Sequence, residues 1–93
     1  MKGTRKMIPV TRNYLITYRM RLNITQYEVS RRAGFLQCEY NLIENGFRGH
    51  RMDARKLIHL AEALNVSVDY LCRQEAIYMD EFDERNGREK KWR

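Results

Sequence analysis

Four side chains on one predicted helix have the chemistry needed to read base pairs. The sequence predicts a helix over residues 37–45, in which Tyr40 and Ile43 face inward. The opposite face then carries Gln37, Cys38, Asn41 and Leu42. Gln and Asn can each make two hydrogen bonds to the major-groove edge of adenine, and apolar groups can contact the methyl group of thymine. These residue types therefore indicate a surface that recognises DNA bases.

The segment that follows this helix could bind the nucleic-acid backbone. Asn45 ends the helix, and the loop over residues 47–52 carries Arg48 and Arg51. A loop in this place would lie beside the groove that the helix reads, where polar and cationic side chains contact phosphates. We therefore expect Asn45, Arg48 and Arg51 to contact phosphates.

Other kinds of site have little support in the sequence. Cys38 and Cys72 are 34 positions apart, with no CxxC pair and no His at metal-ligand spacing, so we expect reduced thiols and no metal site. His50 and His59 have no evident catalytic partners, and there is no Ser-His-Asp set or Gly-rich phosphate loop. We expect neither an enzyme nor a cofactor.

The charge of the chain also favours a polyanionic partner. Its 93 residues are enough for one small core. Residues 1–74 carry 13 basic and 6 acidic side chains, whereas residues 75–93 carry 5 basic and 6 acidic ones. A basic folded body attracts nucleic acid. No uncharged run approaches the ~20 residues of a membrane span, so we expect a cytoplasmic protein with no membrane contact.

Helices joined by short turns must position these side chains. The chain has a single proline, Pro9, and its β-branched residues do not alternate, so the predicted class is all-α. Pro9 suits the first turn of a helix that begins near Ile8 or Val10 and ends at Arg21.

Capping signals predict the next helices, which cover residues 26–33, 37–45 and 54–64. Thr25 with Glu28 forms a capping box for the first of them, and Gly34 ends it. Asp53 caps the last. The first two, with the tight turn between them, have the layout of a helix-turn-helix.

The last part of the chain is predicted as a short helix followed by a tail. The short helix begins at Ser67 and runs through Leu71, and the composition changes at Gln74. A tail helix over residues 75–85 would place Tyr78 and Phe82 on one face, packed against the domain or a second subunit. The predicted organisation is a basic arm (1–9), a helix-turn-helix domain (10–73) and a tail (74–93).

Two segments of the chain closely resemble the lambda-repressor-like family of phage and bacterial repressors, which includes Cro. The first segment, over residues 25–46, matches at Gln26, Val29, Ser30, Gly34, Phe35, Tyr40, Ile43 and the run Glu44-Asn45-Gly46. The second, over residues 60–71, matches the closing segment of the family. The resemblance departs at Ser30, where Ala is usual, and at Tyr40, where Ile or Val is usual. The Tyr40 hydroxyl then needs a hydrogen-bond partner or solvent.

The resemblance implies roles for three further residues. Gln26 would bond a DNA phosphate and brace a side chain of the recognition helix. Arg19, from the first helix, would form a structural pair with Glu44 at the end of that helix.

The function implied by the resemblance is sequence-specific binding of double-stranded DNA by a transcriptional regulator, most simply a repressor. Such proteins bind as homodimers to pseudo-palindromic operators, with two half-sites about one helical turn apart. Two alternatives remain open: an antitoxin partnered with a toxin, and a protein-interaction module on the same fold. A protein partner could also contact the C-terminal tail.

Overall fold

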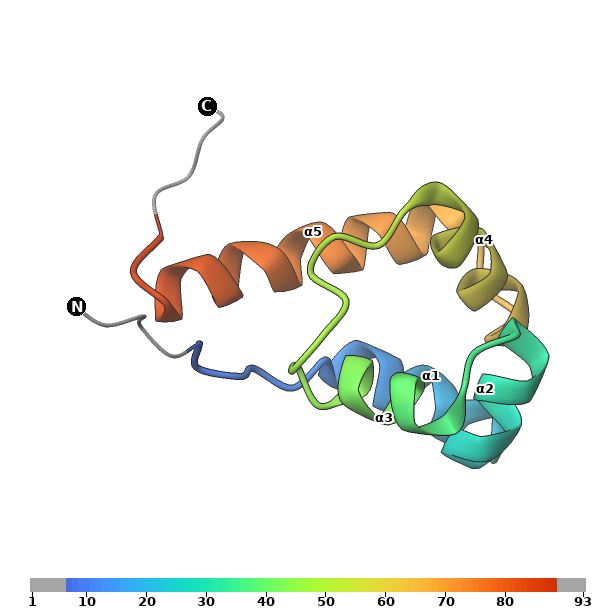
Figure 1. Ribbon diagram of the computed structural model, residues 1–93. Helices are drawn as coiled ribbons and strands as arrows, with labels where there is room; N and C mark the ends of the chain where they lie inside the picture. Colours follow the sequence, from blue (N-terminus) through green and yellow to red (C-terminus); the bar gives the residue numbers. More distant parts are fainter. Residues whose placement is uncertain (1–6, 89–93) are drawn as a thin grey trace.

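Five helices follow one another along the chain, for which the computed structural model describes residues 7–88 (Figure 1). They are α1 (Asn13–Leu22), α2 (Gln26–Ala33), α3 (Gln37–Glu44), α4 (Ala54–Ala63) and α5 (Val68–Arg85). α2 packs on α3 and α4, α1 packs on α3, and α4 packs on α5. The part of the chain that the structure describes contains no strand, so the predicted all-α class is confirmed.

Local signals place α2 where it was predicted. The Thr25 hydroxyl accepts a hydrogen bond from the Glu28 N–H at 3.1 Å, and Gly34 follows the helix with a φ of 79°. A Cβ added at Gly34 would meet no atom within 4 Å, so there is space for a side chain. Glycine is favoured here because of the left-handed backbone conformation alone. Asp53 and Ser67 cap α4 and α5 through their side chains, as predicted for Asp53.

The predicted start of the first helix is wrong. α1 begins at Asn13, because the backbone before it bonds to distant parts of the chain. The Ile8 N–H donates to the side-chain oxygen of Asn86 at 2.7 Å, and the Asn86 amide donates back to the Ile8 carbonyl at 3.1 Å. The Arg12 N–H donates to the Glu44 carbonyl at 2.8 Å. The proline in this segment therefore precedes the helix instead of opening it.

The last helix is also longer than predicted. α5 is one continuous helix of 18 residues, in place of a short helix ending at Leu71 and a separate helix in the tail. The predicted boundary between residues 73 and 74 falls inside it. No Gly or Pro occurs between Val68 and Arg85, so the change in composition does not interrupt the backbone hydrogen bonds.

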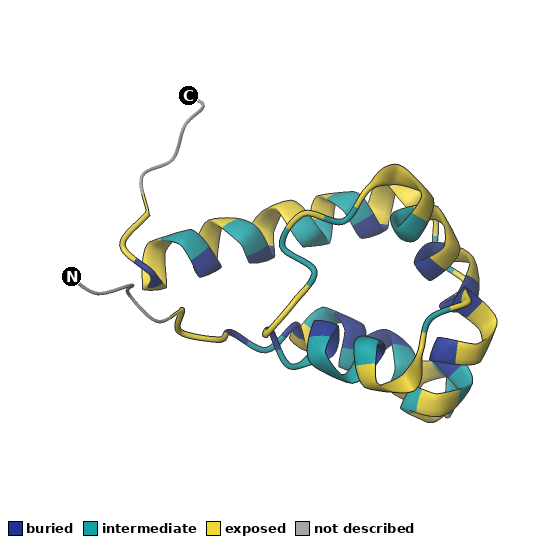
Figure 2. Cartoon of the chain, in the orientation of Figure 1, coloured by how far each residue is buried: buried dark blue, intermediate teal, exposed yellow. Residues whose placement is uncertain are grey.

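Two groups of apolar side chains form the interior (Figure 2). The larger group includes Leu15, Tyr18, Val29, Ala33, Tyr40, Ile43, Leu60, Ala61, Leu64 and Leu71. The smaller group joins α5 to the segment before α1 and consists of Val10, Tyr78 and Phe82. Tyr78 and Phe82 therefore lie on one face of α5 and pack against the domain, which confirms that prediction.

A close approach of two backbone segments explains Gly46. Its φ is 86°, and a Cβ added there would lie 2.0 Å from the carbonyl oxygen of Val10. Any side chain at this position would force apart the end of α3 and the segment before α1.

Within residues 7–88, no helix is both long enough and apolar enough to cross a membrane. Residues 1–6 of the predicted arm and residues 89–93 of the predicted tail lie outside the described residues.

Candidate nucleic-acid interface

The turn between α2 and α3 determines which face of α3 is exposed. The Phe35 N–H donates to the Ser30 carbonyl at 2.8 Å and closes the end of α2. Ser30 is buried, and its hydroxyl donates to the Tyr27 carbonyl at 2.7 Å. On α3, Tyr40 and Ile43 are buried in the core. α3 thus packs with one face and leaves the opposite face uncovered.

The four predicted base-reading residues lie together on the outer face of α3. Gln37 and Cys38 are exposed, while Asn41 and Leu42 are half-buried. Within residues 7–88 the Gln37 amide makes no side-chain hydrogen bond, so its donors and its acceptor are available to a ligand.

A buried carboxylate lies beneath this face. Glu44 is only 1% exposed, and it accepts hydrogen bonds from three side chains. Arg19 donates through two nitrogens at 2.9 and 3.1 Å, Tyr40 through its hydroxyl at 2.7 Å, and Gln26 through its amide at 2.6 Å. The structure thus pairs Arg19 with Glu44 and gives the Tyr40 hydroxyl a partner.

These contacts keep Glu44 ionised. Burial acts to raise the pKa of its carboxyl, but the hydrogen bonds from Arg19, Tyr40 and Gln26 outweigh burial. The pKa of Glu44 is therefore lowered from its usual value of 4.5.

Glu44 also sets the orientation of two amides. A carboxylate only accepts hydrogen bonds, so Gln26 must turn its NH₂ toward Glu44 and its oxygen away. That oxygen accepts from the amide nitrogen of Asn41 at 3.0 Å. Asn41 keeps one N–H and its oxygen available, and these are the donor and acceptor that the edge of adenine requires. We call the chain of hydrogen bonds from Glu44 through Gln26 to Asn41 the amide relay.

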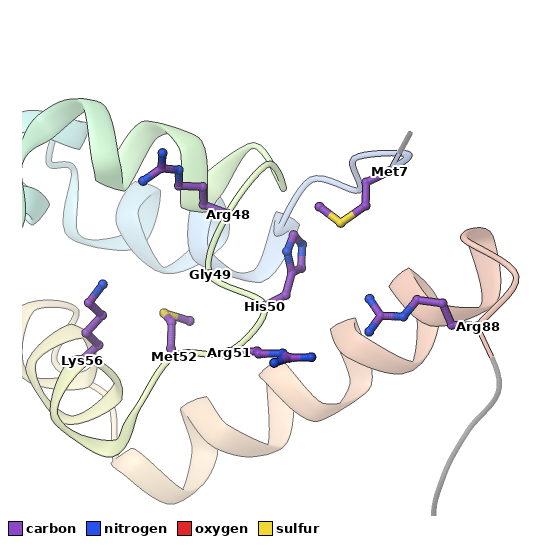
Figure 3. A pocket seen from close by; sticks show the side chains of 8 residues that line it. All are labelled: Met7, Arg48, Gly49, His50, Arg51, Met52, Lys56 and Arg88. Atoms are coloured by element: carbon purple, nitrogen blue, oxygen red, sulfur yellow. The ribbon is translucent and has the colours of Figure 1, made fainter. Parts of the chain in front are cut away.

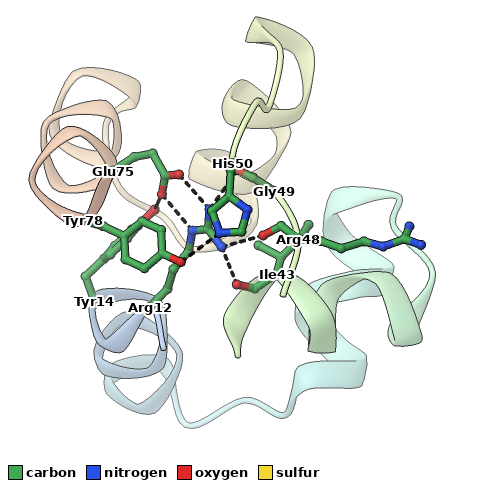
Figure 4. Close-up of polar contacts among 8 residues, drawn as sticks. All are labelled: Arg12, Tyr14, Ile43, Arg48, Gly49, His50, Glu75 and Tyr78. Atoms are coloured by element: carbon green, nitrogen blue, oxygen red, sulfur yellow. Dashed lines mark hydrogen bonds and ion pairs between the residues drawn. The ribbon is translucent and has the colours of Figure 1, made fainter. Parts of the chain in front are cut away.

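The loop after α3 is held by a buried arginine (Figure 4). Arg12 is 0% exposed, and each of its five N–H groups donates a hydrogen bond. Two go to the Glu75 carboxylate, and the others go to the carbonyls of Ile43, Arg48 and Gly49. Through Glu75, α5 therefore fixes the loop that carries Arg48.

Aromatic groups complete the surroundings of Arg12. Its guanidinium lies 4.2 Å from the centre of the Tyr78 ring, and the Tyr14 hydroxyl donates to the same Glu75 carboxylate. Burial acts to lower the pKa of Arg12, but its hydrogen bond and charge interaction with Glu75 outweigh burial and raise it. The guanidinium therefore stays charged in the interior.

Neither Arg12 nor Glu75 was identified from the sequence. The groups that the Arg12 side chain bonds, three backbone carbonyls and the Glu75 carboxylate, lie between 31 and 63 positions away in the chain. Helical periodicity, capping motifs and turn residues are local, so none of them marks a pair at this separation. In the sequence, a buried arginine just before a helix looks the same as an exposed arginine at that position.

Three of the four predicted phosphate contacts lie just after α3 and in the following loop. Asn45 is half-buried, whereas Arg48 and Arg51 are exposed, and neither arginine has an ion pair within the part of the chain that the structure describes. Gln26 lies apart from these three, at the start of α2, with one amide N–H left after its bond to Glu44.

The described residues do not bring together three or more His, Cys, Asp or Glu side chains in a way that could hold a metal ion. Cys38 and Cys72 are both free thiols.

The chain matches no model of a known protein family and no curated protein. Its fold is similar to that in the crystal structure of the clp gene regulator ClgR from Corynebacterium glutamicum, with a TM-score of 0.62 and 17% sequence identity. The match covers 82% of this chain and 79% of the ClgR chain. The two proteins therefore share a fold.

Proposed function

We propose that this protein is a sequence-specific regulator of transcription that binds double-stranded DNA with α3 in the major groove. The observation that carries the proposal is the outer face of α3, where Gln37 is unpaired and the amide relay orients Asn41. The resemblance of residues 25–46 and 60–71 to the lambda-repressor-like family supports it. The similarity in fold to a protein named as a gene regulator is consistent with it.

Each predicted site residue has a role in this proposal. Gln37 and Asn41 bond adenine edges, and Cys38 and Leu42 pack against thymine methyl groups. The phosphate contacts are Gln26, Asn45, Arg48 and Arg51. Arg19 and Glu44 do not touch DNA but hold the amide relay in place.

We further propose that the protein is a repressor that acts in the cytoplasm as a homodimer on a pseudo-palindromic operator. Selection of bound duplexes from a random pool, with the mass of the complex measured alongside, tests this proposal. We expect a half-site repeated in inverted orientation, with centres about one helical turn apart, and two protein chains per duplex. A pool that shows no enriched sequence would contradict sequence-specific binding.

Replacing Gln37 with alanine should remove discrimination at one base pair in each half-site. A Gln amide bonds two groups on the edge of adenine, so we expect a loss of about 1–3 kcal/mol on the selected operator. Binding to a panel of single-base operator variants measures the change. The panel should show a relaxed preference at one position only.

The matched variant for this experiment is Arg48→Ala, because a phosphate contact carries no base information. It should weaken binding to every member of the panel by a similar factor. If Gln37→Ala also weakens all of them equally, Gln37 does not read a base. If it changes nothing while the protein stays folded, α3 is not the recognition helix.

The affinity for DNA should fall steeply as salt increases. Arg48 and Arg51 from two subunits neutralise at least four phosphates, so a plot of log K against log salt should be steeper than about −3. Titrations from low to physiological salt provide the slope. A flat dependence would reject DNA binding through this surface.

A further inference from the structure

Four cationic side chains from separate parts of the chain surround one open cavity (Figure 3). Arg48 and Arg51 come from the loop after α3, Lys56 from α4, and Arg88 from just beyond the end of α5. The cavity has a volume of about 470 Å³, within the range of sites that hold small ligands. Its described lining contains no carboxylate.

The charges around this cavity are only partly neutralised. Lys56 pairs with Glu39 at 2.7 Å, and Arg88 lies at a longer 3.5 Å from Asp83. Arg48 and Arg51 have no ion pair among residues 7–88. Cationic groups gathered in this way repel one another, and a bound anion relieves the repulsion.

Contacts inside the protein hold the walls of the cavity in place. Arg12 donates to the carbonyls of Arg48 and Gly49, both at 2.8 Å, which fixes one wall. On the other side, the Arg88 N–H donates to the Asp83 carbonyl at 2.8 Å. His50 stacks on Phe82 with ring centres 4.0 Å apart and so joins the loop to α5. A site held in this way loses little conformational entropy when a ligand binds.

We infer that this cavity binds a phosphate group and that Arg88 is one of the residues that bind it. Arginine guanidinium groups match phosphate oxygens with paired N–H donors, and three of the four cations are arginines. Arg48 lies in the loop directly after α3, and its N–H donates to the Leu42 carbonyl of that helix at 3.2 Å, so the cavity lies beside the proposed recognition helix. The inference rests on the proposed function in one respect, namely that the phosphate belongs to the DNA backbone. A free phosphate compound is the other source of the same group.

This inference extends the DNA-binding surface to the end of α5. The predicted site included only α3, the start of α2 and the loop after α3. The sequence continues after Arg88 with one acidic residue, Glu89, and three basic ones, Lys90, Lys91 and Arg93, so the charge that follows along the chain is positive.

The test compares Arg88→Gln with Arg85→Gln in the full chain. Both variants remove one positive charge from exposed positions three residues apart, but Arg85 lies outside the cavity and pairs with Glu81 at 3.0 Å. The first measurement is the salt dependence of binding to a random-sequence duplex. The second is an NMR titration of the protein alone with inorganic phosphate, against sodium chloride of equal ionic strength. Circular dichroism establishes that both variants are folded.

We expect Arg88→Gln to flatten the salt dependence by about 0.9 per subunit and Arg85→Gln to leave it unchanged. We also expect phosphate to shift the amide signals of Gly49 and Arg51 in the wild type but not in Arg88→Gln. If only the phosphate shifts depend on Arg88, the cavity binds a free phosphate compound rather than DNA. Equal effects of the two variants on the slope, with no phosphate shifts, would overturn the inference.

The two arms separate this inference from the proposed function. If the wild-type protein binds no duplex at all, the proposed function fails. The phosphate titration alone then decides whether the cavity binds phosphate. If the duplex binds but neither measurement depends on Arg88, the proposed function stands and the phosphate site is rejected.

Discussion

Replacing Arg12 with methionine should lower the free energy of unfolding by about 3–5 kcal/mol, because a buried charge loses its partner. The side chain of Glu75 is only 13% exposed and would lose its cationic partner in the interior. The carbonyls of Ile43, Arg48 and Gly49 would each lose a donor. Urea unfolding followed by circular dichroism measures the change.

The control for this variant is Arg55→Met, at an exposed position on α4, for which we expect a change within about 0.5 kcal/mol. Adding Glu75→Met to Arg12→Met should recover part of the loss, because no uncompensated charge then remains. An Arg12→Met protein as stable as Arg55→Met would show that the buried cluster contributes nothing.

Replacing Glu44 with alanine should cost about 3–5 kcal/mol of stability, since Glu44 is buried and accepts from three side chains. The variant leaves Arg19 and the Tyr40 hydroxyl without a carboxylate, and it frees the Gln26 amide to turn. The variant should therefore discriminate less between bases at the position that Asn41 reads, under conditions in which the protein remains folded. Urea unfolding and the single-base operator panel measure the two effects.

The pH dependence identifies the ionised carboxylate as the cause. The folded-state pKa of Glu44 is lowered from 4.5, so its stabilising effect is complete above that pH and is lost as the pH falls through the folded-state value. The difference in stability between wild type and Glu44→Ala should narrow below pH 4.5 accordingly. Glu62→Ala, at an exposed position on α4, is the control and should change stability little at either pH. A Glu44→Ala protein that behaves like this control would contradict the prediction.

The part of the fold that carries α3 was predictable because its signals are local. Thr25 caps the start of α2 and Gly34 ends it, and each acts within a few residues of its own position. The inward positions of Tyr40 and Ile43 follow from helical spacing in the same way. Once these residues are assigned, the exposed face of α3 follows without knowledge of the rest of the chain.

The error at the start of the first helix arose because distant contacts decide the structure there. Pro9 is a good residue for the first turn of a helix, but the backbone around it bonds to Asn86 and Glu44 instead. The change in composition near residue 74 resembled a domain boundary, yet the buried positions Leu71, Tyr78 and Phe82 continue along one helix. The Arg19–Glu44 pair was expected only from the resemblance, and Arg12 had no local signal.

The contacts of α5 also govern when the chain can complete its fold during synthesis. Arg12 needs Glu75, which is 63 positions later, and Ile8 needs Asn86, which is 78 positions later. A nascent chain that ends before residue 75 can form the α2–α3 turn, but it lacks the carboxylate that balances Arg12 beneath the loop after α3. The loop with Arg48 is therefore fixed only after α5 has left the ribosome as far as Glu75, although the recognition helix itself is made much earlier.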